Sequence, residues 1–159
     1  MAGPSHDFAC HLVWTGAAAG PTRDYRGYDR TYRVDFEGKP PLVGSAAPPF
    51  RGDGALHNPE DLLVAALSAC HALSYLAQCA RGRVEVVAYE DRATGRMALV
   101  DGGLQFVEVD LHPRVTVSPG TDLAKAERLH GPAHAECFIA RSVAFPVRHH
   151  PSVSVAEPG

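Results

Sequence analysis

Two of the four cysteines stand in sequences that could carry redox chemistry. Cys70 lies in residues 68–71 (SACH), in the middle of a long apolar segment, and Cys137 ends residues 134–137 (HAEC). A cysteine reacts as its thiolate, which a nearby cation must stabilise. If the two thiols meet in the fold, Cys70 oxidised to a sulfenic acid can be resolved by Cys137 as a disulfide. The alternative for Cys70 is a space-filling role, because free cysteines are among the most buried residues.

A zinc site competes with this interpretation. His130, His134 and Cys137 are spaced i, i+4, i+7, which would place three metal ligands on one helical face. Gly131-Pro132 stands between the first two ligands and interrupts a continuous helix, so we predict no metal site here. The pair 149–150 (HH) is expected in a loop or tail.

The element that must position Cys70 is a helix over His57 to Gly82. Asn58 can cap it, Pro59 suits its first position, and Asp61 stands where a capping box has its acid. Apolar and small residues occur on all sides, which predicts a buried central helix. A chain of 159 residues has difficulty covering every side of a helix about 30 Å long, so the sequence favours a homodimer in which two such helices pack together.

The order of the remaining elements predicts an α+β fold rather than the alternating βαβ pattern of a nucleotide-binding fold. Thr121 is the expected cap of a second helix, which Gly131-Pro132 interrupts, and a third helical piece is expected over 132–140. Pro146 should end the regular pattern before one last strand. The predicted strands cover residues 8–14, 31–37, 41–44, 83–91, 97–100, 104–110, 113–117 and 152–155.

Composition narrows the functional class. The chain has 159 residues and a formal charge of −3 without a basic stripe, which argues against a nucleic-acid partner. It fits a single domain over residues 1–159. Neither a secretory signal nor a convincing membrane span is recognised, so the expected location is cytoplasmic, with no membrane partner. Four cysteines in such a protein are expected to be reduced or redox-active rather than a structural disulfide framework.

Several motifs together resemble the signature of the OsmC/Ohr family of peroxide-detoxifying proteins. Residues 58–63 (NPEDLL) followed by 67–71 (LSACH) resemble the first cysteine motif, and 133–140 (AHAECFIA) resembles the second. Residues 28–30 (YDR) and 50–53 (FRGD) are similar to the OsmC-like branch. The resemblance covers roughly residues 8–150.

The resemblance implies an organic hydroperoxide reductase that uses no metal or flavin cofactor. Cys70 would be the peroxidatic thiolate and Cys137 the resolving cysteine. Arg30 would stabilise the thiolate and orient the peroxide, and Glu60 would hold that arginine. The family fold is an intertwined α+β homodimer, with antiparallel sheets around two long central helices. Its members are reduced by dithiols, notably lipoylated proteins. The alternative is an OsmC-like domain that binds a small apolar or electrophilic ligand without turnover.

Helix geometry limits how these roles can combine. Glu60 and Cys70 are ten residues apart, or about 15 Å along a helix. Both can therefore meet one arginine only if the helix is broken or if they come from different chains. Arg141 and Tyr32 depart from the family pattern. Four arginines rival Arg30 for its role: Arg23, Arg26, Arg33 and Arg51. Of the two remaining cysteines, Cys79 is expected to be structural, and Cys10 has no matching motif and is expected to be a strand residue.

Overall fold

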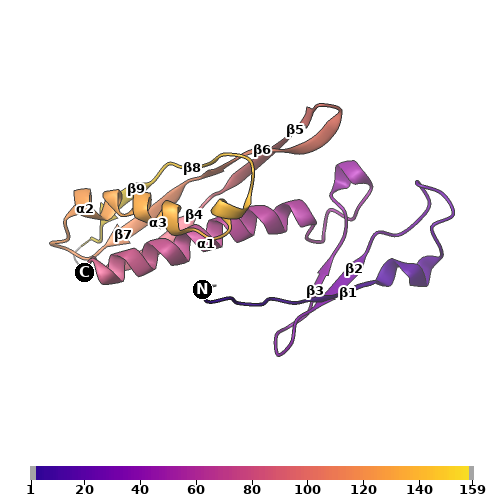
Figure 1. The fold of residues 1–159 in the computed structure, drawn as a ribbon, viewed down its shortest axis with the longest axis horizontal. Coiled ribbons are helices and arrows are strands. Elements are labelled where there is room, and N and C mark those ends of the chain that lie inside the picture. The colour runs from indigo at the N-terminus through magenta and orange to yellow at the C-terminus, as the bar shows by residue number, and fades with distance from the viewer. Residues whose placement is uncertain (1–2, 158–159) are drawn as a thin grey trace. The chain divides into compact units, whose positions relative to one another are not determined.

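The computed structural model describes residues 3–157, which form two compact units divided between Leu62 and Leu63 (Figure 1). The division falls inside the long helix α1 (Pro59–Arg81). The boundary between the two units therefore contains no flexible linker, and the sequence has no stretch with the composition of a linker. The architecture is mixed helix and sheet, as the sequence predicts.

The first unit is built on a small antiparallel sheet with the strand order β1-β2-β3. A bridge between Gly44 and His57 joins the last of these strands to the segment before α1. Gly44 is required here because a Cβ at this position would lie 2.4 Å from the Tyr32 ring. The elements of this unit are β1 (His11–Trp14), η1 (Thr15–Ala19), β2 (Tyr32–Asp35), β3 (Leu42–Gly44) and η2 (Pro48–Phe50).

The second unit contains two three-stranded sheets, with the orders β4-β7-β9 and β5-β6-β8. In each sheet one pair of strands is antiparallel, and the strand nearest the C-terminus adds in parallel. At Pro113 the chain leaves the sheet β5-β6-β8 and enters the sheet β4-β7-β9. The strands are β4 (Val86–Asp91), β5 (Thr94–Val100), β6 (Gly103–Leu111), β7 (Pro113–Val117), β8 (Val147–His149) and β9 (Ser152–Val155).

The start of α1 is fixed by a reciprocal cap. The Asp61 N–H donates to Asn58 Oδ1 at 2.8 Å, and Asn58 Nδ2 donates to Asp61 Oδ2 at 2.9 Å. The side chain of Asn58 thus satisfies a backbone donor that the first turn cannot satisfy internally. The predicted helix and its capping residues are confirmed.

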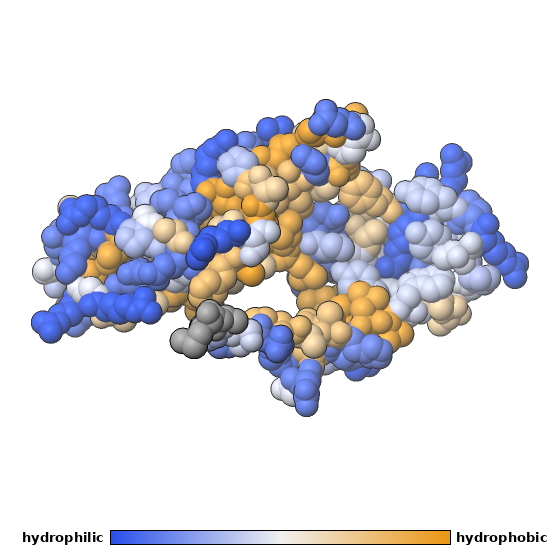
Figure 2. Space-filling model, in the orientation of Figure 1, coloured by the Kyte–Doolittle hydropathy of each residue, from blue (hydrophilic) through white to orange (hydrophobic). Residues whose placement is uncertain are grey.

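Only one face of α1 is buried in the described chain. Four residues at i, i+4, i+8 and i+12 form that face, namely Leu67, His71, Tyr75 and Cys79. The opposite face leaves an apolar stripe uncovered, and apolar surface gathers in Figure 2 where Figure 1 places α1 and its neighbouring strands. The stripe consists of Ala65, Ala66, Ala69, Leu73, Leu76 and Ala80. By length and composition alone α1 could cross a membrane, but its buried face packs within its own unit.

Two short helices follow the sheets, α2 (Leu123–Arg128) and α3 (His130–Glu136). Asp122 caps α2 by accepting a hydrogen bond from the Lys125 N–H at 3.0 Å, so the prediction of Thr121 as the cap is wrong. The expected break at Gly131-Pro132 is also wrong. The chain bends at Leu129, and Pro132 lies in the first turn of α3, where its missing N–H has no intrahelical partner to lose.

The hairpin β5–β6 packs on α1 through a position that only glycine fits. A Cβ on Gly95 would lie 2.7 Å from Val64 Cγ2 and 2.8 Å from Phe106 Cε1. We expect Gly95→Ala to lower the free energy of unfolding by about 1–3 kcal/mol through overpacking. Gly131→Ala is the matched control, because nothing lies within 4 Å of its added Cβ and the site is helical. That control should gain about 0.5–1 kcal/mol in urea unfolding; equal effects of both variants would contradict the packing argument.

Candidate active site

The thiols of Cys70 and Cys137 meet in the second unit. The two side chains lie close enough for Cys70, together with burial, to alter the ionisation of Cys137. Cys70 is half-buried on α1, whereas Cys137 is buried at the C-terminal cap of α3. Both are free thiols in this structure. Two cysteines separated by 67 residues in sequence are thus brought into one site, as a peroxidatic and a resolving cysteine would have to be.

The environment of Cys137 keeps this thiol protonated at neutral pH. Burial, and then the neighbouring Cys70 side chain, raise the pKa of Cys137 to about 11. The Ala140 N–H donates to Cys137 Sγ at 3.4 Å and holds the sulfur at the end of the helix.

Apolar side chains surround the thiol pair. Leu67, one turn before Cys70, is fully buried in a core cluster that also includes Ile139 and Ala140, which follow Cys137. Such a setting is better suited to an apolar substrate than to a strongly hydrated one. Cys79 faces the other core cluster; burial raises the pKa of its thiol, in keeping with the predicted structural role.

Arg30 belongs to the first unit, where its own loop holds it. Its guanidinium donates to the Tyr28 carbonyl at 2.9 Å and to the Tyr25 carbonyl at 2.5 Å. It also lies over the Tyr28 ring, 3.9 Å from the centroid. These contacts fix the charge in one place without neutralising it. Among its rivals, Arg33 is already paired with Asp35 at 2.7 Å.

Glu60 lies in the first turn of α1, and its Oε2 atom is buried without a hydrogen-bond partner among the described residues. Burial, and then the negative charge of Glu60, raise the pKa of Tyr32. A buried carboxylate oxygen without a partner is costly and calls for a donor. The helix α1 is continuous from Pro59 to Arg81, which removes the possibility that a break brings Glu60 and Cys70 together.

Four histidines gather beside the thiol pair, a cluster that the sequence analysis missed. His71 Nε2 lies 3.0 Å from His130 Nδ1, and the His149 ring is stacked 5.3 Å from the His71 ring. His134 joins them at a ring distance of 5.1 Å from His149. The prediction of a loop or tail over 149–150 is wrong for His149, which is the last residue of β8. The signal that could have found the cluster is that His71 follows Cys70 directly, while His130 and His134 share one helical face.

The zinc alternative finds no support in this arrangement. His130 turns toward His71, while Cys137 contacts Cys70. Within residues 3–157, no group of three or more His, Cys, Asp or Glu side chains is arranged to hold a metal ion.

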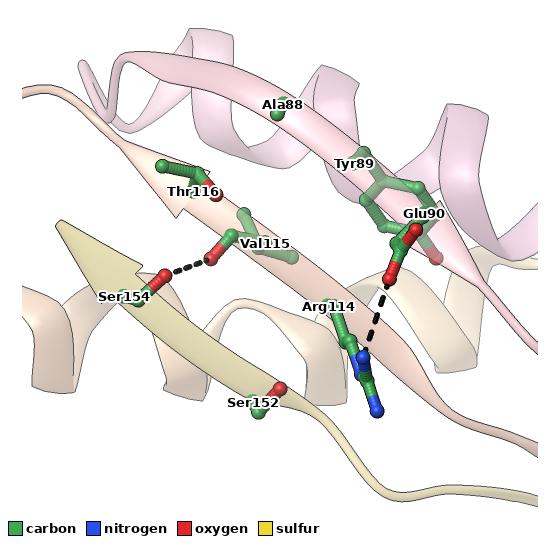
Figure 3. Close-up of a pocket in the computed structure, with 8 residues that line it drawn as sticks. All are labelled: Ala88, Tyr89, Glu90, Arg114, Val115, Thr116, Ser152 and Ser154. Carbon is green, nitrogen blue, oxygen red and sulfur yellow. Dashed lines mark hydrogen bonds and ion pairs between the residues drawn. The ribbon is translucent and has the colours of Figure 1, made fainter. Parts of the chain in front are cut away.

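A separate hollow of about 460 Å³ lies on the sheet β4-β7-β9, away from any cysteine or histidine (Figure 3). Two of its polar contacts are internal, since Arg114 pairs with Glu90 at 3.5 Å and Ser154 Oγ donates to the Val115 carbonyl at 3.5 Å. The Tyr89 hydroxyl is buried without a partner among the described residues. Nothing in its lining can act as a redox group, so the thiol pair is the better candidate site.

Comparisons with known proteins point to one family. Residues 52–151 match the family model described as OsmC-like protein. A solved OsmC-like protein of unknown function from Vibrio cholerae O1 biovar eltor is 30% identical, with 93% of this chain and 100% of that chain covered and a TM-score of 0.84. Two organic hydroperoxide resistance proteins share the fold. The one from Elizabethkingia anophelis is 19% identical and the one from Legionella pneumophila 18%, each with 96% of this chain and 100% of its own covered and a TM-score of 0.67. No protein with curated annotation matches the chain.

The histidine cluster makes the stability of the fold depend on pH. Burial, followed by the charges of the other histidines, lowers the pKa of His71 to about 4 and that of His130 to about 3. Because these values lie below the ordinary value of 6.5, the unfolded chain binds protons first. Stability is therefore complete above pH 6.5 and is lost as the pH falls from 6.5 toward 4.

We expect the free energy of unfolding to fall by up to about 2.7 kcal/mol per pH unit in this window, about 1.4 for each histidine. Urea unfolding at pH 7.5, 6.0 and 5.0 measures it. His112→Gln changes an exposed histidine outside the cluster and should leave the slope as it is. A stability that stays constant down to pH 5 would contradict the buried, neutral state of the pair.

Proposed function

The chain belongs to the OsmC-like protein family, and on this premise we propose that it is a thiol-dependent peroxidase that reduces organic hydroperoxides to alcohols. The observation that carries the proposal is that the fold brings Cys70 and Cys137 close enough for one thiol to act on the ionisation of the other. Their apolar surroundings favour an organic peroxide over hydrogen peroxide. Solved relatives are named for organic hydroperoxide resistance, which supports the same chemistry at the level of the family.

The proposed cycle balances without a metal or flavin. The Cys70 thiolate attacks one peroxide oxygen, so that an S–O bond forms, the O–O bond breaks and the alkoxide leaves as the alcohol after taking a proton. Cys137 then attacks the Cys70 sulfenic acid, forming the disulfide, and the departing hydroxide takes the Cys137 proton and leaves as water. An external dithiol, of which a lipoylated protein is the candidate suggested by the family, would return both cysteines to thiols.

Arg30 and Glu60 are proposed to complete the site. The guanidinium of Arg30 would stabilise the Cys70 thiolate and orient the peroxide, and Glu60 would anchor that guanidinium through its unpartnered Oε2. Because α1 is continuous, Glu60 and Cys70 of one chain are about 15 Å apart along the helix. We therefore propose that each site draws Glu60 and Cys70 from different chains.

A homodimer is the partner that this arrangement requires. The uncovered stripe on α1 is apolar along its whole length, and Leu73 at its centre is 68% exposed. A second copy of α1 would cover it with the same small and apolar residues. Free thiols are kept in a reducing compartment, so we propose that this dimer works in the cytoplasm.

The peroxidase proposal is tested by stopped-flow oxidation with cumene hydroperoxide and with a fatty-acid hydroperoxide. We expect Cys70→Ser to abolish peroxide-dependent thiol loss, a fall of at least about three orders of magnitude, because the nucleophile is removed. Cys137→Ser should react once and accumulate a sulfenic acid without a disulfide. Cys10→Ser removes an exposed cysteine outside the site and should behave as the wild type.

Equal thiol loss in Cys70→Ser and the wild type would overturn the assignment. Binding of the hydroperoxide without thiol loss in the wild type would favour the alternative, a binding domain without turnover.

The dimer proposal is tested by light scattering coupled to size exclusion at micromolar concentration. We expect the wild type to have twice the chain mass and Leu73→Glu to be monomeric, because the new carboxylate would be buried without a partner. Leu123→Glu is the matched control: it places the same charge on an exposed leucine at the start of α2, where the helix dipole tolerates it. A monomeric wild type would contradict the proposal.

A further inference from the structure

The four histidines form one cluster between α1, α3 and β8, of which His71 and His130 are buried and His134 and His149 half-buried. The His71 and His130 rings are parallel at 5.3 Å, and His149 stacks on His71 at the same distance. His130 also stacks on Tyr75 at 3.8 Å. The exposed fractions of His71 and His130 are 0% and 1%. These imidazoles occupy positions where apolar side chains would fill the core at lower cost, so their presence requires a reason.

The hydrogen bond between His71 and His130 leaves both of its ends open. If His71 Nε2 donates, His71 Nδ1 is a bare lone pair and His130 Nε2 carries an unused N–H; the other tautomer exchanges these roles. Within residues 3–157, both atoms are buried without a partner, and so is His134 Nδ1. The cluster therefore always contains at least one nitrogen that can take a proton from outside without first breaking a hydrogen bond.

The same bond ties together the two elements that carry the thiols. His71 follows Cys70 on α1, and His130 begins the helix that Cys137 caps. In the described chain, one other buried hydrogen bond connects α1 to the α2–α3 segment. The Tyr75 hydroxyl donates to the Ala126 carbonyl at 3.0 Å, and Tyr75 lies one turn farther from Cys70 than His71 does. The remaining two, from Arg81 and Lys125, are exposed. The His71–His130 bond is thus the buried polar contact nearest in sequence to the thiol pair.

We propose that His71 and His130 are positioning residues for the Cys70–Cys137 pair, and that proton uptake by the histidine cluster separates α3 from α1 and disfavours disulfide formation. The proposal concerns disulfide formation with any two-electron oxidant. It therefore does not depend on the peroxidase activity proposed above.

The groups that face the cluster come from several elements: the Tyr75 ring from α1, the His134 ring from α3 and the His149 ring from β8. Burial and the His149 and His134 rings disfavour a positive charge on His71, whereas one carboxylate favours it. The carboxylate that acts on His71 is Asp91 on β4, whose oxygens already accept from Ser68 Oγ and the His112 N–H.

Two protons are enough to break the contact between the helices. A first proton can be shared between His71 and His130, but the charge remains buried away from water. A second places N–H against N–H across 3.0 Å. Opening the contact hydrates both rings, so acid shifts the equilibrium toward the open form. Because Cys137 moves with α3, its sulfur then leaves Cys70.

The experiment is a redox titration of the full-length chain with reduced and oxidised glutathione. Cys70 attacks the glutathione disulfide and releases one glutathione; Cys137 then attacks the mixed disulfide and releases the second. The equilibrium constant is the effective concentration of one thiol at the other. It is measured at pH 7.0 and 5.0 by alkylation and mass spectrometry, with a catalytic selenol to keep exchange at equilibrium in acid.

We expect the wild-type constant to fall at least tenfold from pH 7.0 to 5.0. Ionisation of Cys70 alone would act in the opposite direction, because a thiolate stabilises the reduced form at high pH. His130→Gln can still donate and accept a hydrogen bond but takes up no proton, so it should keep the value at pH 7.0 and fall less than threefold. The equilibrium constant of His130→Leu should be low at both pH values. The control His112→Gln should show the same fall as the wild type.

A wild-type constant that is level or rises toward pH 5.0 would overturn the proposal, whether or not any variant folds. A full fall in His130→Gln would overturn it equally, since the effect would then come from other groups. Peroxide is absent from this experiment, so its outcome is separate from the outcome of the peroxidase test.

Discussion

The packing of one face of α1 against α3 is the constraint on which the candidate site depends. Tyr75 anchors it, because its hydroxyl donates to the Ala126 carbonyl and its ring stacks on His130. Every buried polar group on this face needs a partner, and each partner found lies on the α2–α3 segment. These contacts fix the rotation of α1 about its axis, and the rotation in turn directs Cys70 toward Cys137. The reactive pair is therefore a consequence of core packing rather than of a flexible loop.

Local chemistry explains why much of the fold could be predicted. Asn58 and Asp61 form reciprocal hydrogen bonds within one turn, so the four residues from 58 to 61 are enough to predict where α1 starts. The strands β5 and β6 are neighbours in sequence and pair as a hairpin, and the sequence predicts strands over 97–100 and 104–110. In both places the residues that stabilise the element lie inside it, and the prediction needed no knowledge of the rest of the chain.

Long-range contacts explain what could not be predicted. His149 lies in a strand because β8 pairs in parallel with β6, some 40 residues earlier in the chain, and three residues carry too little pattern to indicate this. The break between the helices falls at Leu129 instead of Gly131-Pro132, since the first turn of a helix tolerates proline. Prediction of the histidine cluster would have required both the strand at His149 and the break between the helices at Leu129. The roles of Cys70 and Cys137 were suggested by motifs, but their contact required the fold.

Two separate deficits on α1 lead to the same answer about its partner. The exposed stripe lacks apolar cover, and Glu60 at the first turn lacks a donor for a buried oxygen. A membrane would cover the stripe but could not supply a donor to Glu60, and an ion pair alone would leave Leu73 in water. A second copy of this chain offers both an apolar helix face and an arginine held in place by its own loop carbonyls. In a two-fold symmetric interface each chain would cover the stripe of the other and supply a donor to its Glu60, so that one interface would serve both chains. The geometry of α1 thus supports the proposed assembly, in which the core helix of one chain and the first turn of the other would act on the same thiol.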